Sequence, residues 1–125
     1  MFPNSLQGDD VLEILDLARL IVDAIADKQG DDIVLLDIRP ISLIADYFII
    51  SSAGTDRQLA AIADGVIDKT RDEGVRPLHA EGDAESGWML LDYGGVIIHL
   101  FSPELRAYYA LEDLWKQAPV VLRMK

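Results

Sequence analysis

The sequence predicts an α/β protein with a single mixed sheet of about five strands, flanked by helices. Three stretches have the character of helices, and five short apolar runs between them have the character of strands. Along the chain they follow the order helix, strand, strand, helix, strand, strand, strand, helix. The last two strands are joined by the pair Gly94-Gly95, which is typical of a tight hairpin turn and therefore indicates an antiparallel pair.

The first helix is predicted to begin at Asp10 and to end at Gly30. Asp10 and Glu13 have the spacing of a capping box, and the apolar residues that follow recur at helical spacing. Acidic residues occupy the opposite arc, so this helix buries one face and exposes the other. Two nearly continuous apolar runs come next, 33–38 and 46–52, as expected of strands that are covered on both faces.

The second helix has clear signals at both ends. Thr55 and Gln58 form a capping box that opens it, and Gly74 is predicted to end it. Residues 75–80 form a weaker strand, for which Pro77 favours an edge position. This strand–helix–strand unit allows its two strands to be parallel.

An acidic loop, 81–87, leads into the two hairpin strands, 88–93 and 96–101. The last helix opens directly after the hairpin with a Ser-Pro pair, in which the serine is the N-cap and the proline is the first helical residue. Pro119 is predicted to end this helix, and the residues that follow are predicted to be extended.

The composition favours a protein as the macromolecular partner. The chain has 125 residues, the size of one domain, and carries 11 Lys and Arg against 22 Asp and Glu, a net charge of −11. Such a charge opposes electrostatic binding to nucleic acid and to anionic membranes, whereas it suits a basic protein. The absence of cysteine excludes disulfides, thiolate zinc sites and cysteine nucleophiles.

The two ends of the chain bear on its organisation and location. No apolar run reaches the roughly 18 residues of a membrane span, and the first residues lack the pattern of a secretory signal or a transit peptide. We therefore predict a cytoplasmic protein that binds neither a membrane nor DNA. Its organisation is predicted as a flexible N-terminal arm, 1–8, one domain, 9–118, and a short C-terminal tail, 119–125.

Two loops have residues that suit a ligand, and each also has a purely structural explanation. The turn 52–55 joins a buried strand to a helix N-terminus, where backbone N–H groups can hold a phosphate. It lacks the lysine and the glycine spacing of a P-loop, so a capped turn with a glycine at positive φ is the alternative. Glu81, Asp83 and Glu85 offer the oxygen ligands that Mg²⁺ or Ca²⁺ prefers, but they lack the EF-hand pattern and equally form a solvated loop.

Titratable residues in the predicted strands give no complete catalytic set. His79 and His99 lie on different strands without a third metal ligand, and His99 has the surroundings of a half-buried, hydrogen-bonded histidine. No serine lies in a nucleophile elbow. Asp37 and Asp92 would form a metal-binding or acid–base pair if they met across the sheet, and solvated strand ends are the alternative.

Aromatic side chains gather in three segments, 47–48, 88–93 and 108–115. A strand alternates its side chains between two faces, which groups Trp88, Leu90 and Asp92 on one face and Met89, Leu91 and Tyr93 on the other. One set faces the core, and the other is exposed or covered by a helix or a partner. Aromatic residues beside polar groups are typical anchors of protein interfaces, while packing of the last helix on the hairpin is the alternative.

Sequence motifs over most of the chain occur together and in a fixed order. They are Asp46–Ser52, Arg57-Gln58 with Ile62-Ala63-Asp64, Glu81-Gly82, Trp88–Gly94 with Val96–Phe101, and Tyr108–Trp115. Together they resemble the motifs of the ribosomal silencing factor family, RsfS, also called the Iojap family. The resemblance runs from about Val11 to Pro119.

The resemblance implies a nucleotidyltransferase-like fold without the nucleotidyltransferase active site. Asp37 is followed by Ile38 and Arg39, where such enzymes carry a second metal-binding acid. It further implies a translational repressor that binds ribosomal protein fourteen of the large ribosomal subunit and thereby sterically blocks joining of the small subunit. No catalytic residue, cofactor or metal is implied, and members of the family are regarded as forming homodimers.

The resemblance also implies a set of partner-binding residues. The positions that face the partner are Trp88, Asp92 and Tyr93, and further motif positions are Tyr47, Gly94, His99 and Tyr109. Truncating Trp88 or Tyr93 to alanine is expected to weaken ribosome binding about 10-fold or more without unfolding the domain.

Two other hypotheses remain open at this point. One is a residual nucleotidyl or phosphoryl transferase that works at the Gly54 turn with Mg²⁺ on Asp37 or Asp92, and it predicts Mg²⁺-dependent nucleotide binding. The other is an oligomerisation or scaffold module, whose aromatic surface serves only self-association.

Overall fold

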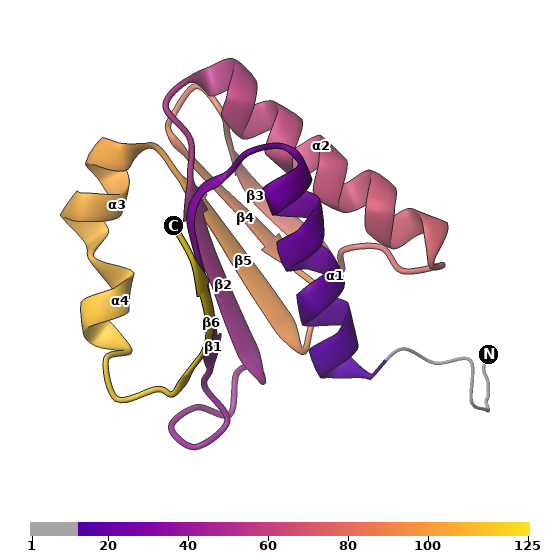
Figure 1. Ribbon diagram of the computed structural model, residues 1–125, viewed down its shortest axis with the longest axis vertical. Coiled ribbons are helices and arrows are strands. Elements are labelled where there is room, and N and C mark those ends of the chain that lie inside the picture. The colour runs from indigo at the N-terminus through magenta and orange to yellow at the C-terminus, as the bar shows by residue number, and fades with distance from the viewer. Residues whose placement is uncertain (1–12) are drawn as a thin grey trace.

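The computed structural model describes residues 13–125, apart from the side chain of Leu114, and it confirms the predicted fold class (Figure 1). The described helices are α1 (Ile14–Asp27), α2 (Asp56–Asp72), α3 (Pro103–Tyr109) and α4 (Leu111–Leu114). The strands are β1 (Asp31–Asp37), β2 (Tyr47–Ser52), β3 (His79–Asp83), β4 (Trp88–Asp92), β5 (Val96–Phe101) and β6 (Val120–Met124). The nucleotidyltransferase-like character implied by the resemblance stays a prediction.

The six strands form one sheet in the order β3-β4-β5-β2-β1-β6. Neighbours are antiparallel except β2 and β5, which are parallel. The predicted hairpin at Gly94-Gly95 is confirmed as the β4–β5 pair. β2 and β3, which the strand–helix–strand unit allowed to be parallel, run in the same direction, but they are not neighbours, because β2 pairs with β5 and β3 lies at the far edge of the sheet.

The sheet has one more strand than about five, because the C-terminal tail pairs with β1. Leu122 of β6 lies opposite Leu35, and Met124 lies opposite Ile33. The tail carries no turn signal or alternation of its own, so only its pairing with a strand far back in the sequence makes it a strand.

Helices cover both faces of the sheet. In Figure 1, α1 and α2 lie on one face, and α3 and α4 lie on the other. Alternate residues of β1 enter two separate apolar clusters: Ile33 and Leu35 join the cluster beneath α1 and α2, whereas Val34 and Leu36 join the cluster beneath α3 and α4. The prediction that this strand is covered on both faces is therefore confirmed.

The ends of α1 differ from the prediction. Glu13 has an extended backbone and is the N-cap, so α1 begins at Ile14, and the predicted cap Asp10 lies outside the described residues. At the other end Gln29, not Gly30, has a positive φ, of 63°. Gly30 is required for another reason: a Cβ there would collide with the Ile25 side chain.

The other helix signals are local and are confirmed. The Thr55 hydroxyl accepts the backbone N–H of Gln58 at 3.1 Å, and Gly74 follows α2 with a φ of 79°. Ser102 caps α3, of which Pro103 is the first residue. None of the helices within 13–125 is both long and apolar enough to cross a membrane.

The last helix is not continuous to Pro119. Ala110 has a left-handed backbone, with a φ of 47°, and it separates α3 from α4. No proline or glycine marks this break in the sequence, which is why a single helix was expected.

The weak strand is shifted by several residues. β3 spans His79–Asp83 rather than 75–80, so part of the predicted acidic loop belongs to the sheet. Its edge position, which Pro77 favoured, is confirmed. Gly82 has a φ of 78°, and a Cβ there would collide with the carbonyl oxygen of Trp88. Only glycine allows this close approach, which fixes β3 beside the first residue of β4.

Candidate functional site

On the face of the sheet that carries α3 and α4, the helices cover the strands near β1 but leave the strands near the β3 edge open. Leu105, Leu111 and Trp115 pack on the cluster formed by β1, β2 and β5. Toward the β3 edge the side chains become more exposed, since Trp88 and Leu90 of β4 are half-buried and all of β3 is exposed. We call this uncovered part of the sheet the open face.

Cross-strand pairing determines which residues lie on the open face. Trp88 lies opposite Phe101, and Leu90 lies opposite His99. Paired residues of antiparallel strands point to the same side, so these four side chains form one continuous surface. The predicted grouping of Trp88 with Leu90, away from Tyr93, is therefore confirmed.

His99 lies at the centre of an aromatic cluster. Its ring stacks on Phe101 at 5.8 Å between centroids and meets the Phe48 ring edge-on at 5.4 Å. The Trp88 indole N–H donates to His99 Nδ1 over a long 3.5 Å. Burial lowers the pKa of His99 to about 4, so the imidazole is neutral near pH 7 and the cluster has no charge of its own.

This burial predicts a pH dependence of stability. The unfolded chain takes up the His99 proton near pH 6.5 and the folded chain only near pH 4. The stability due to the neutral ring is complete above pH 6.5 and decreases as the pH falls toward 4. Between about pH 7 and about pH 5 we expect the free energy of unfolding to decrease by on the order of 1–2 kcal/mol. Urea unfolding should show a smaller decrease for His99→Gln, and an equal decrease would contradict the assignment.

A pocket adjoins the cluster, between the sheet and the helices. Its volume is about 240 Å³, and its lining is almost entirely apolar. The lining residues are Trp88, His99, Phe101, Tyr109 and Leu111. Tyr109 is 52% exposed, so part of the pocket wall faces solvent.

Carboxylates border the open face. Glu81 and Asp83 of β3 lie opposite Leu90 and Trp88, and therefore on the same side of the sheet. Asp92 continues the β4 alternation and accepts the backbone N–H of Gly94 at 2.7 Å. An apolar centre with an acidic border suits an apolar contact on a basic protein.

Two of the seven residues implied to bind the partner lie in the core on the opposite side of the sheet. Tyr47 is 4% exposed and Tyr93 is 7% exposed, and both belong to the cluster beneath α1 and α2. The Tyr93 hydroxyl lies 2.8 Å from the Thr70 hydroxyl, and burial raises the pKa of Tyr93. The Arg39 guanidinium lies over the Tyr47 ring. Neither aromatic side chain offers the surface expected of a contact residue.

The seven predicted residues thus separate into three groups. Trp88, His99 and Tyr109 come together at the pocket. Asp92 and Gly94 form the β4–β5 turn, where Gly94 has a φ of 85°. The remaining two tyrosines are buried. Sequence reasoning missed Phe101 and Leu111 as pocket residues, although the alternation of β5 already placed Phe101 on the same face as His99.

The other candidate sites receive less support. Asp37 and Asp92 do not meet, because β1 and β4 are separated by β5 and β2, and Asp37 is bound by Arg39, which lowers the pKa of its carboxyl group. Gly54 is not among the described glycines with a positive φ, so that part of the turn explanation is wrong. Within residues 13–125, no group of three or more His, Cys, Asp or Glu is placed to hold a metal ion.

Comparison with known proteins gives one consistent family. Residues 11–125 match the RsfS family model, described as "Ribosomal silencing factor during starvation". Ribosomal silencing factor RsfS of Bacillus subtilis is 43% identical over 94 residues, covering 75% of this chain and 80% of that protein. The factor of the same name from Halalkalibacterium halodurans is 39% identical over 106 residues, covering 85% of this chain and 91% of that protein. A crystal structure of a Chromobacterium violaceum protein is similar with a TM-score of 0.81 and 32% identity, covering 84% of this chain and 88% of that one.

Proposed function

The chain belongs to the ribosomal silencing factor family, and from this premise we propose that it represses translation by keeping the ribosomal subunits apart. Family membership gives it a ribosome-associated role in silencing translation. Beyond that role, the proposal is that it binds ribosomal protein fourteen of the large subunit and sterically blocks the small subunit. The proposed place of action is the cytoplasm.

The open face carries this proposal. Trp88, Leu90 and His99 form an uncharged apolar centre, and the carboxylates of Glu81 and Asp83 lie beside it. Ribosomal proteins are in general basic because they neutralise RNA phosphates, so a partner of that kind is complementary in charge. The net charge of −11 at the same time opposes binding to exposed ribosomal RNA, which directs the chain to protein rather than to nucleic acid.

In this proposal the seven motif residues have different tasks. Trp88, His99 and Tyr109 contact the partner directly, because they line the pocket and remain accessible: Trp88 and His99 are half-buried and Tyr109 is exposed. Asp92 and Gly94 shape the β4–β5 turn, in which Asp92 accepts the Gly94 backbone N–H. Tyr47 and Tyr93 act indirectly, by holding the sheet on which the contact residues lie.

The proposed mechanism needs no catalysis, only occupancy of a surface. An interface of ordinary size, roughly 800 Å² per partner, is sufficient to exclude a competing surface. The transferase alternative placed Mg²⁺ on Asp37 or on Asp92, but Asp37 is bound by Arg39 and Asp92 accepts the backbone N–H of Gly94, so neither carboxylate favours it. Calorimetry with ATP, GTP or CTP and Mg²⁺ would revive that alternative if it gave saturable heat.

Sedimentation of purified ribosomal subunits tests the function. We expect the protein to migrate with the large subunit and not with the small one, and to reduce the joined ribosomes that form at raised Mg²⁺. Normal subunit joining without co-migration would contradict the proposal. Co-migration with both subunits would contradict the assignment of the partner to the large one.

We also propose that the chain forms a homodimer through β6. The two edges of the sheet differ: β3 is acidic and carries the kinked Gly82, features that block strand pairing, whereas β6 presents four exposed apolar residues, Val120, Val121, Leu122 and Met124. An exposed apolar edge strand is a ready surface for antiparallel pairing with its own copy. Sedimentation equilibrium should give a dimer, and a monomer throughout the micromolar range would contradict it.

A further inference from the structure

We infer that Arg106 is a positioning residue for the partner surface, because it holds α3 and α4 against β1 and so fixes one wall of the apolar pocket. Residues 103–114 are called the α3–α4 unit below. The inference rests on the proposed function, since it assigns a task to a residue outside the pocket that the proposed partner occupies.

The pocket is built from two parts of the chain. Its sheet side consists of Trp88, His99 and Phe101, which belong to β4 and β5. Its other side consists of Tyr109 and Leu111, which flank the joint between α3 and α4. The width of the pocket therefore depends on where the α3–α4 unit lies over the sheet.

Apolar packing alone attaches this unit weakly. α3 buries none of its residues, and Tyr108 is 79% exposed. Leu105 and Leu111 are only partly buried where they pack on the sheet. Ala110, with its left-handed backbone, breaks the helix between them, so the two short helices do not support each other as one rigid rod.

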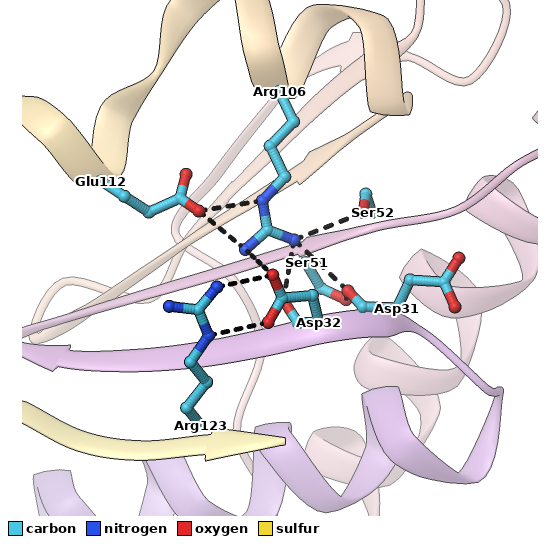
Figure 2. Close-up of polar contacts among 7 residues, drawn as sticks. All are labelled: Asp31, Asp32, Ser51, Ser52, Arg106, Glu112 and Arg123. Atoms are coloured by element: carbon cyan, nitrogen blue, oxygen red, sulfur yellow. Dashed lines mark hydrogen bonds and ion pairs between the residues drawn. The ribbon is translucent and has the colours of Figure 1, made fainter. Parts of the chain in front are cut away.

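The Arg106 guanidinium supplies the missing attachment, as Figure 2 shows. Its Nη1 donates to the carbonyl oxygen of Asp32 at 2.7 Å, and to the Asp31 carbonyl and the Ser52 hydroxyl at 3.3 Å each. Its Nε and Nη2 donate to one carboxylate oxygen of Glu112 at 3.1 and 3.0 Å. One planar side chain thus connects α3 with α4 and both with the ends of β1 and β2.

The guanidinium is the most buried part of this contact, since the Asp32 and Glu112 side chains are 33% and 31% exposed. The Arg106 side chain is 10% exposed, and the Asp32 carboxylate lies 3.6 Å from its Nη2. Asp32 is also bound by Arg123 of β6, at 3.0 and 2.8 Å. Hydrogen bonds from a buried charged group are stronger than exposed ones, and removing Arg106 takes this donor from the Glu112 carboxylate and the Asp32 carbonyl oxygen.

The test combines a distance with an affinity. The chain contains no cysteine, so spin labels at introduced Tyr108→Cys and Glu85→Cys report the distance between the α3–α4 unit and the β3–β4 turn. We expect Arg106→Met to broaden the distance distribution and, in unlabelled protein, to weaken large-subunit binding about 10-fold or more. Arg106→Lys keeps the positive charge but loses the planar group of several N–H donors. We therefore expect it to lie between the parent and Arg106→Met in both the width of the distance distribution and the affinity.

Arg71→Met is the matched control, because it removes a guanidinium from an ion pair with Asp68 on α2, on the other face of the sheet from the α3–α4 unit. It should leave both the distance distribution and the affinity unchanged. A merely structural role of Arg106 would lower the unfolding temperature but leave the distribution of the folded protein narrow, which would overturn the inference. If Arg106→Met does not fold, the width of the distance distribution in Arg106→Lys decides whether Arg106 positions the unit.

Two further outcomes separate this inference from the proposed function. A broad distribution with the parent's affinity would overturn the inference, because the unit would then not shape the partner surface. If the parent protein itself does not bind large subunits, the proposed function fails, and the distance distribution alone decides whether Arg106 positions the unit.

Discussion

Replacing Trp88 with alanine is expected to weaken binding to the large ribosomal subunit about 10-fold or more, or roughly 1.4 kcal/mol and above. Trp88 is half-buried, lines the pocket and donates its indole N–H to His99. A partly exposed tryptophan at the centre of an apolar surface is the residue type that contributes most to protein interfaces. The affinity is measured by titrating labelled protein with purified large subunits.

Matched variants separate the loss of contact from a loss of fold. Trp88→Phe keeps an aromatic ring in the pocket without the indole N–H, so it should bind more tightly than the alanine variant. Leu43→Ala removes a fully exposed apolar side chain from the β1–β2 loop, away from the open face, and should bind like the parent. Circular dichroism must show both Trp88 variants folded. A folded Trp88→Ala with the parent's affinity would show that the open face is not the partner surface.

Features set by neighbouring residues could be predicted from the sequence. The caps of α2 and α3 and the β4–β5 turn depend on a few adjacent residues, and the structure confirms them. The separation of Trp88 from Tyr93 follows from strand alternation alone. The aromatic segments also point to β4, the strand on which the candidate surface is proposed.

Features set by distant residues could not be predicted in this way. β6 becomes a strand because it pairs with β1, and two of the Arg106 partners lie 74 and 75 residues earlier in the chain. The break at Ala110 adopts a backbone that alanine does not prefer, so no local signal marks it. Tertiary contacts determine the first two of these features, and local propensity does not predict the third.

The burial of Tyr93 shows the same limit at the candidate site itself. Alternation shows that Tyr93 and Trp88 lie on opposite faces, but it does not show which face is covered more completely. Both faces of β4 carry apolar residues, so the pattern suits either one. The structure decides the question because α1 and α2 close over the Tyr93 side, whereas α3 and α4 leave the Trp88 side partly open.

This burial changes the expected result of truncating Tyr93. We expect Tyr93→Ala to lower the free energy of unfolding by about 3–5 kcal/mol, because it leaves a cavity in the core and removes the partner of the Thr70 hydroxyl. Such a loss is a large part of the roughly 5–15 kcal/mol of a typical domain. Urea unfolding measures it as a shift of the midpoint. A loss of ribosome binding in this variant would then follow from the disturbed core rather than from a lost contact.

Tyr93→Phe keeps the ring and tests the assignment without that complication. It removes only the hydroxyl contact with Thr70, which should cost about 1 kcal/mol of stability. Thr70 retains its hydrogen bond to the Ile67 carbonyl oxygen, which limits the penalty. The folded variant should bind the large subunit within about twofold of the parent, because the hydroxyl lies on the side of the sheet opposite the open face. A folded Tyr93→Phe with about 10-fold weaker binding would instead mean that the Tyr93 hydroxyl reaches the partner, and that α2 moves away from β4 when the subunit binds.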